Sequence, residues 1–290
     1  MRRLRIAVCL YFVLSCVVFA VYFGKSRMVE DHTPPVITCD EDTVSASVGD
    51  GEDIILKGVT AKDDKDGNIT GQVRISSMSH FIEKGKRTVD YIVFDKANHA
   101  GTAQRTLVYT DYVPPKIHLT KALRYSASEM SGVNLLENVT AEDCLDGDLT
   151  NQVRTTLGDD FYRYEPGEYP VTLQVSNSAG DVCSVQVDVV VTDNTDRYEI
   201  DKFYPMLSEY IAYTAVGTEI DPGAYLIGVE RGNAEYLFEE GGANTDVGAD
   251  DISIQSNVDY SQAGVYTVEY SYTSKNGGTA VTKLYVVVEE

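Results

Sequence analysis

The sequence predicts an all-β protein, built from tandem β-sandwich modules that follow one N-terminal transmembrane helix. Three observations support this prediction: an apolar run near the N-terminus, an internal repeat of 80 residues, and alternation of apolar and polar residues within the repeats. Hydrophobic residues make up 43% of the 290 residues, enough for folded cores. Tyr, Val and Thr dominate the repetitive part, and these side chains favour strands.

The first element is the apolar run. Three arginines within the stub 1–5 precede an uncharged segment, residues 6–23. As a helix rising about 1.5 Å per residue, this segment is roughly 27 Å long, which is the thickness of a bilayer core. Basic residues beside a membrane span stay in the cytoplasm. We therefore expect a single-pass cell-membrane protein with its N-terminus inside and its modules outside the cell.

Three fates of this segment remain open. An uncleaved signal anchor fits its length, which exceeds a usual signal-peptide core. Cleavage after Val18-Phe19-Ala20 fits the small-residue rule for signal peptides, and lipidation at Cys16 would use the poor lipobox Val13-Leu14-Ser15. All three fates place the bulk of the chain outside the cytoplasm.

The repeat defines the next two modules, at 33–112 and 113–194. Residues 59–70 return as residues 139–150, and the pair Pro34-Pro35 returns at the same offset. Each copy contains about seven short segments in which apolar and polar residues alternate, and Gly, Asn, Asp or Pro separates them. This pattern is typical of an immunoglobulin-like sandwich.

A third and more divergent module is expected at 195–290. The alternation Gly-x-Tyr-x-Val at Gly264–Val268 matches Gly167–Val171 in the second copy. The Asp-Gly segment that marks the first two copies is missing, and Asp250-Asp251 replaces it poorly. We nevertheless expect the same fold.

The repeat resembles the bacterial immunoglobulin-like surface repeats first named from an insecticidal crystal toxin. The resemblance is carried by Asp-x-x-Asp-Gly-[Asn/Asp]-[Ile/Leu]-Thr at Asp63–Thr70 and Asp143–Thr150, together with the Pro-Pro-x-Ile start and the Gly-x-Tyr-x-Val strand. It covers residues 34–193 well and 195–290 weakly. It implies architecture and a surface location, because the family has no common catalytic residues.

The aspartate loops are the first candidate site. Several oxygen ligands within six residues suit Ca²⁺, although the bidentate glutamate that closes an EF-hand is missing. The alternative is a turn in which the carboxylates bond nearby backbone amides. The candidate calcium ligands are Asp63, Asp64, Asp66, Asn68, Asp143, Asp146 and Asp148.

The cysteines outside the apolar run allow one disulfide. Cys144 lies in a loop and Cys183 lies just after a hairpin tip, and these two loops gather at one end of an immunoglobulin-like sandwich. A Cys144–Cys183 bond is therefore feasible, with two buried thiols as the alternative. Cys39 is expected to be a buried thiol rather than a nucleophile.

Four tyrosines in the third module are a candidate ligand-facing surface: Tyr260, Tyr266, Tyr270 and Tyr272. A tyrosine platform would stack on a glycan or a protein partner, whereas alternating strand tyrosines are often half-buried sandwich residues. The chain lacks Trp, which weakens the glycan interpretation.

Charge and motifs exclude other functions. A net charge of −21 repels phosphate backbones, so no nucleic-acid partner is expected. The four histidines show no metal-ligand spacing, and no nucleophile elbow or Walker loop occurs. We therefore predict a non-catalytic binding or adhesion protein, with an extracellular protein or glycan as its partner. The alternative is a structural spacer or envelope-assembly subunit without its own ligand.

Overall fold

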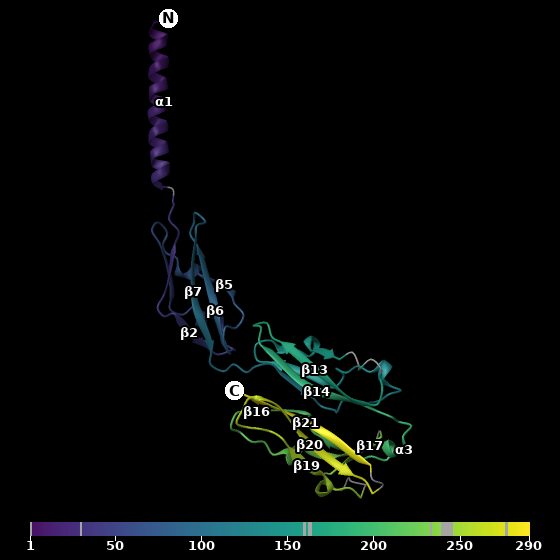
Figure 1. Cartoon of the computed structure of the whole chain (residues 1–290). Coiled ribbons are helices and arrows are strands. Elements are labelled where there is room, and N and C mark those ends of the chain that lie inside the picture. The colour runs from purple at the N-terminus through teal and green to yellow at the C-terminus, as the bar shows by residue number, and fades with distance from the viewer. Residues whose placement is uncertain are drawn as a thin grey trace. The chain divides into compact units, whose positions relative to one another are not determined.

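The computed structural model describes residues 2–29, 31–158, 161, 164–232, 234–238, 246–275 and 278–290. It divides into two compact units, Met1–Tyr112 and Val113–Glu290. The first unit contains the N-terminal helix and one sandwich, module 1. The second unit contains two sandwiches, modules 2 and 3 (Figure 1).

The N-terminal helix α1 spans Arg2–Val29. Within it, Ile6–Lys25 has a mean hydropathy of 2.6, and none of this stretch is buried. In the described part of the chain it is the one helix long and apolar enough to cross a membrane. Its length and composition are those of a membrane span, and an N-terminal signal sequence has the same properties.

Module 1 packs a three-stranded sheet, β1-β3-β4, on a four-stranded sheet, β2-β7-β6-β5. Alternation builds the core: Val89, Tyr91 and Val93 on β6 are at most 1% exposed, and the residues between them are not buried. The elements are β1 (Val36–Cys39), β2 (Thr43–Ala46), α2 (Glu52–Ile55), β3 (Val59–Asp63), β4 (Gly67–Asn68), η1 (Thr70–Gln72), β5 (Arg74–Met78), β6 (Lys86–Phe94) and β7 (Ala100–Tyr109).

Module 2 repeats this arrangement, with sheets β11-β10-β8 and β12-β13-β14-β9. The parallel pair β2–β7 of module 1 has its equivalent in β9–β14. The elements are β8 (Lys116–Leu119), β9 (Arg124–Ser126), η2 (Met130–Gly132), β10 (Val139–Asp143), β11 (Gly147–Asp148), η3 (Thr150–Gln152), β12 (Arg154–Leu157), β13 (Gly167–Ser176) and β14 (Val182–Thr192).

Module 3 has the same two sheets, β15-β17-β18 and β16-β21-β20-β19, although its sequence diverges. All-β sandwiches after one apolar N-terminal helix are thus confirmed. The elements are α3 (Arg197–Ile200), β15 (Tyr204–Leu207), β16 (Ile211–Ala215), η5 (Pro222–Tyr225), β17 (Leu226–Arg231), β18 (Ala234–Leu237), η6 (Ala249–Asp251), β19 (Ser253–Ser256), β20 (Gly264–Thr273) and β21 (Thr279–Glu289).

The hydrophobic cores differ between the two units. Module 1 has a core of its own, whereas the buried residues of modules 2 and 3 form one continuous cluster. Tyr210, Ile211 and Tyr285 of module 3 belong to this shared cluster. Modules 2 and 3 therefore form one compact unit with a shared hydrophobic core.

Polar groups of module 3 complete the edge strand β8 of module 2. The Tyr213 hydroxyl donates to the Ile117 carbonyl at 3.0 Å and accepts from the Ile117 amide at 2.8 Å. Glu209 accepts from the Leu119 amide at 3.0 Å. An open strand edge needs such partners because its unpaired backbone groups otherwise invite aggregation.

Candidate cation cluster and inter-module cleft

The two Asp-Gly segments form the same tight turn in modules 1 and 2. In module 1, Asp63 Oδ1 accepts from the amides of Lys65, at 2.9 Å, and Asp66, at 2.7 Å. In module 2, Asp143 Oδ1 makes the equivalent pair of bonds. Gly67 has a φ of 75°, which only glycine adopts without strain. One oxygen of each leading aspartate is therefore a turn acceptor.

The next acidic residue along each turn accepts hydrogen bonds from the neighbouring hairpin tip. Asp66 accepts from the amide of Lys96 at 2.7 Å and from its Nζ at 2.8 Å, which ties the turn to the β6–β7 hairpin tip. These bonds lower the pKa of Asp66. Asp146 makes the equivalent bonds to the amide and hydroxyl of Ser178 in module 2.

The remaining predicted ligands do not join a cluster either. Asn68 and Asp148 accept from the amides of Thr70 and Thr150, at 3.0 and 2.9 Å. Asp64 is exposed. The predicted seven-residue ligand set is therefore wrong as a set, because most of its oxygens bond to nearby backbone or hairpin groups, as in the alternative turn interpretation.

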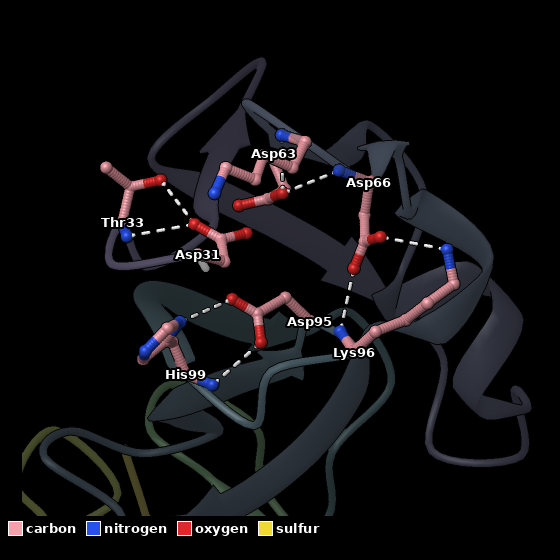
Figure 2. Close-up of polar contacts among 8 residues, drawn as sticks. Asp31, Thr33, Asp63, Asp66, Asp95, Lys96 and His99 are labelled. Carbon is pink, nitrogen blue, oxygen red and sulfur yellow. Dashed lines mark hydrogen bonds and ion pairs between the residues drawn. The ribbon is translucent and has the colours of Figure 1, made fainter. Parts of the chain in front are cut away.

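Asp63 is the exception, because its second oxygen has no partner. Asp63 is 7% exposed, and Asp63 Oδ2 is a buried atom without a hydrogen bond. Figure 2 shows the side chains of Asp31, from the segment before β1, and Asp95, which follows β6, gathered around the same space as Asp63. The Asp31, Asp95 and His99 donor atoms lie within 4.8 Å of one another.

Asp95 and His99 hold each other in place. The Asp95 side chain is fully buried, and its Oδ2 lies 2.8 Å from His99 Nδ1. Asp95 Oδ1 accepts from the His99 amide, also at 2.8 Å. Sequence reasoning missed Asp31, Asp95 and His99. The signal was the offset of the repeat, which aligns Asp95 with Asn177 and Asp31 with Asp111.

The predicted Cys144–Cys183 disulfide is not formed. Cys144 Sγ points at the Val113 backbone, with 3.1 Å to its carbonyl and 3.3 Å to its amide. Cys183 Sγ faces the Tyr213 hydroxyl of module 3 at 3.5 Å, and burial raises the pKa of this thiol. The two side chains are therefore directed to different neighbours. Cys39 is a half-buried thiol whose pKa burial also raises.

The predicted tyrosine platform of module 3 is wrong as well. Tyr270 is fully buried and donates to the Pro222 carbonyl at 2.7 Å. Tyr272 packs edge-on against Phe203, with ring centroids 6.2 Å apart. Tyr260 and Tyr266 are half-buried against the shared core. These side chains fill the sandwich, as strand alternation dictates, and leave no exposed aromatic row among the four.

A cleft of about 790 Å³ lies between modules 2 and 3. Its floor holds Arg124, whose guanidinium stacks 3.5 Å from the Tyr204 ring centroid and pairs with Glu230. The polar side chains of Ser126, Asn138, Ser208 and Glu235 line the walls. The cleft therefore offers hydrogen-bonding groups over an aromatic and aliphatic base, which is the composition of a binding groove.

Comparisons with known proteins find similar solved structures but no matching family. No family model matches this chain, and no curated protein matches it. Among solved structures, Drosophila N-cadherin EC1-4 is 11% identical, with 90% of this chain and 76% of that chain covered and a TM-score of 0.24. Mouse cadherin-23 EC22-24 is 14% identical, with 89% and 99% covered and a TM-score of 0.21.

A bacterial structure also matches. The CBM51-2 and INT domains of Clostridium perfringens ZmpB, in complex with GlcNAc, are 23% identical, with 52% of this chain covered and a TM-score of 0.22. The chain spans about a quarter of the length of that protein.

Proposed function

We propose that this chain is a non-catalytic, membrane-anchored cell-surface protein that uses modules 2 and 3 as a rigid binding head. The observation that carries the anchoring is the unburied apolar stretch Ile6–Lys25, preceded by three arginines in residues 2–5. The positive-inside rule then directs the N-terminus to the cytoplasm and the sandwiches to the exterior. The sandwiches belong to the bacterial surface-repeat type that their Asp-Gly segments resemble.

The inter-module cleft is the proposed ligand site, in place of the tyrosine strands. Its walls come from two modules that share one core, so the cleft keeps its shape without a ligand. Preorganised walls reduce the entropy lost on binding. Hydroxyl, amide and carboxylate groups beside Tyr204 suit a polar surface ligand, namely a glycan or a segment of an extracellular protein.

A structural spacer is the second candidate function. The observation that favours it is the joint between modules 2 and 3, where Tyr213 and Glu209 complete the β8 edge. Such a joint removes a hinge, and a stiff rod is what a spacer or envelope-assembly subunit needs. A spacer has no use for an open cleft, so a test of the cleft separates the two functions.

Orientation is tested first, with the full chain produced in a bacterial membrane. An epitope tag after Glu290 and external protease should report the sandwiches outside the cell and the N-terminus protected. Protection of the C-terminal tag in intact cells would contradict the proposed topology.

Binding is tested with the full chain in nanodiscs, on glycan arrays and on purified surface proteins. The variant Ser208→Trp fills the cleft from an exposed wall position, and Ser253→Trp adds the same bulk on exposed strand β19 as a matched control. We expect Ser208→Trp to weaken binding at least tenfold and Ser253→Trp to leave it unchanged. Equal binding by both variants would exclude the cleft, and no ligand for the parent chain would favour the spacer.

A further inference from the structure

Three carboxylates from separate segments meet at one corner of module 1. Asp31 comes from the segment before β1, Asp63 ends β3, and Asp95 follows β6. Asp31 and Asp95 offer oxygens within 4.8 Å of each other and of a His99 ring nitrogen. Figure 2 shows the carboxylate of Asp31 between those of Asp63 and Asp95. Negative charges gathered in this way repel one another unless a cation compensates them.

Each of the three carboxylates has at least one oxygen lone pair left that could coordinate an ion at this corner. Asp31 Oδ1 accepts from the Thr33 amide and hydroxyl, at 3.1 and 3.0 Å, while Asp31 Oδ2 makes neither bond. Asp63 Oδ2 is buried without a partner. Each oxygen of Asp95 accepts one bond from His99, and a carboxylate oxygen has two lone pairs. A buried carboxylate oxygen without a partner is costly, and a metal ion removes that cost.

Module 2 shows how the same corner is satisfied without an ion. At the position of Asp95 it has Asn177, whose Nδ2 donates to Asp143 Oδ2 at 3.2 Å. Asp143 Oδ2 is the equivalent of the unpartnered Asp63 Oδ2. Asp111, which the repeat aligns with Asp31, belongs to module 1, where its carboxylate accepts from the Ser47 hydroxyl and from the Val48 amide, at 2.8 Å from the latter. The turn is thus common to both modules, and the open carboxylates belong to module 1.

Two lysines, Lys65 and Lys96, neighbour these carboxylates. Lys96 Nζ is bonded to Asp66, outside the three carboxylates. The exposed Lys65 lowers the pKa of Asp31 through its charge, after the larger effect of the Thr33 amide. His99 Nδ1 is bonded to Asp95 Oδ2, and the ligands that the three carboxylates offer are oxygens.

We propose that Asp31, Asp63 and Asp95 bind one divalent cation, and that this cation is Ca²⁺. Hard oxygen ligands from three carboxylates suit Ca²⁺, which takes six to eight oxygens and completes its shell with water. Extracellular calcium modules work at dissociation constants of about 0.1–1 mM, which match a partly exposed site on a secreted sandwich. Bound Ca²⁺ would fasten the segment that follows α1 onto module 1.

The test is calcium titration of the full chain in detergent micelles, by calorimetry and thermal unfolding. We expect one Ca²⁺ per chain and a rise in the Tm of module 1 by about 5 °C or more at 10 mM Ca²⁺. Hydrogen exchange should slow at residues 31–33 and 95–99. Asp95→Asn, which copies the module 2 arrangement, should weaken binding at least tenfold yet raise the Tm in chelator, because Asp63 then gains a donor.

A control variant distinguishes Ca²⁺ binding at this corner from nonspecific binding to exposed acidic side chains. Asp64→Asn removes an exposed carboxylate of the same turn and should bind Ca²⁺ like the parent chain. Equal loss of binding in Asp64→Asn and Asp95→Asn would overturn the proposal, as would an absence of both heat and Tm shift in the parent chain. Binding of Zn²⁺ without Ca²⁺ would overturn the oxygen ligand set and point to the His99 imidazole as a ligand.

Discussion

Modules 1 and 2 are copies of one sandwich, yet the second carboxylate oxygen of the leading aspartate has a hydrogen-bond donor in module 2 and none in module 1. In module 2, Asn177 donates to the buried oxygen of Asp143, so an amide satisfies this oxygen. In module 1, the equivalent residue is Asp95, and Asp63 Oδ2 has no hydrogen-bond partner. One change from amide to carboxylate, at a fixed backbone, separates a closed hydrogen-bond network from a candidate ion site.

The comparison separates what the repeat needs for folding from what it can use for binding. The bonds from Asp63 and Asp143 to the turn amides recur in both modules, so they belong to the fold. The residues at 95 and 177 differ while the hairpin around them is the same. The polar partner of the buried aspartate oxygen can therefore differ between modules without changing the sandwich.

Of the variants that test this comparison, Asn177→Asp is expected to destabilise the protein most. It places a second carboxylate against Asp143, where the Asn177 amide now donates at 3.2 Å. We expect a loss of about 3–5 kcal/mol of unfolding free energy, the usual cost of an uncompensated buried charge. Urea unfolding of the full chain, with and without 10 mM Ca²⁺, measures it. Full rescue by Ca²⁺ would show that two carboxylates are enough, and the role given to Asp31 would be wrong.

The sequence predicts the sandwich fold but not the corner formed by Asp31, Asp63 and Asp95, and the reason is physical. The repeat and the strand alternation predict the sandwiches, because side-chain period and turn residues are local signals. The ion corner needs residues from three segments, and the most local pattern, the run Asp63–Asn68, pointed to the wrong oxygens. Likewise, nothing local in Tyr213 shows that its hydroxyl pairs with the backbone of Ile117 in another module.

A second difference is that module 2 shares its hydrophobic core with module 3, whereas module 1 has a core of its own. The variant Arg124→Met tests the contact between modules 2 and 3. Arg124 is 12% exposed at its side chain, donates to Thr282 at 3.0 Å and pairs with Glu230. Its loss leaves Glu230 without this partner, so we expect about 2–3 kcal/mol of destabilisation, confined to unit Val113–Glu290. Calorimetry of the full chain should show the module 1 transition unmoved.

The double variant Arg124→Met, Glu230→Gln controls for the unpaired charge. It should recover part of the lost stability, because the amide costs less to leave without an ionic partner. No recovery would mean that stacking of Arg124 on Tyr204, rather than the ion pair, holds the joint.

Alkaline pH should distinguish the two units through their tyrosines. Burial raises the pKa of Tyr213 and Tyr285 at the joint, whereas Tyr91 is the described tyrosine of module 1 with a raised pKa. The unfolded chain then loses these protons first, so stability falls as pH rises above about 10, by about 1.4 kcal/mol per pH unit for each such tyrosine.

Urea unfolding between pH 9 and 11 measures this dependence. Unit Val113–Glu290 should weaken more steeply than module 1, and Tyr285→Phe should reduce its slope. The Tyr285 hydroxyl accepts from the Asp188 amide at 2.7 Å, so the same variant should also lower stability at neutral pH. Equal slopes in the two units would contradict the tyrosine-based joint.

The smallest effect is expected from the rim of the joint, at Lys121→Ala. Lys121 Nζ lies 3.3 Å from Glu235 Oε1, and the two side chains are 65% and 50% exposed. Water screens such pairs, so the variant should cost less than about 0.5 kcal/mol, and 0.5 M salt should erase the difference. Lys283 bonds Glu168 and Asp188 while 22% exposed, and Lys283→Ala should cost more. If Lys121→Ala proves the costlier, exposed charges would hold the modules together and the buried tyrosine and arginine contacts would not.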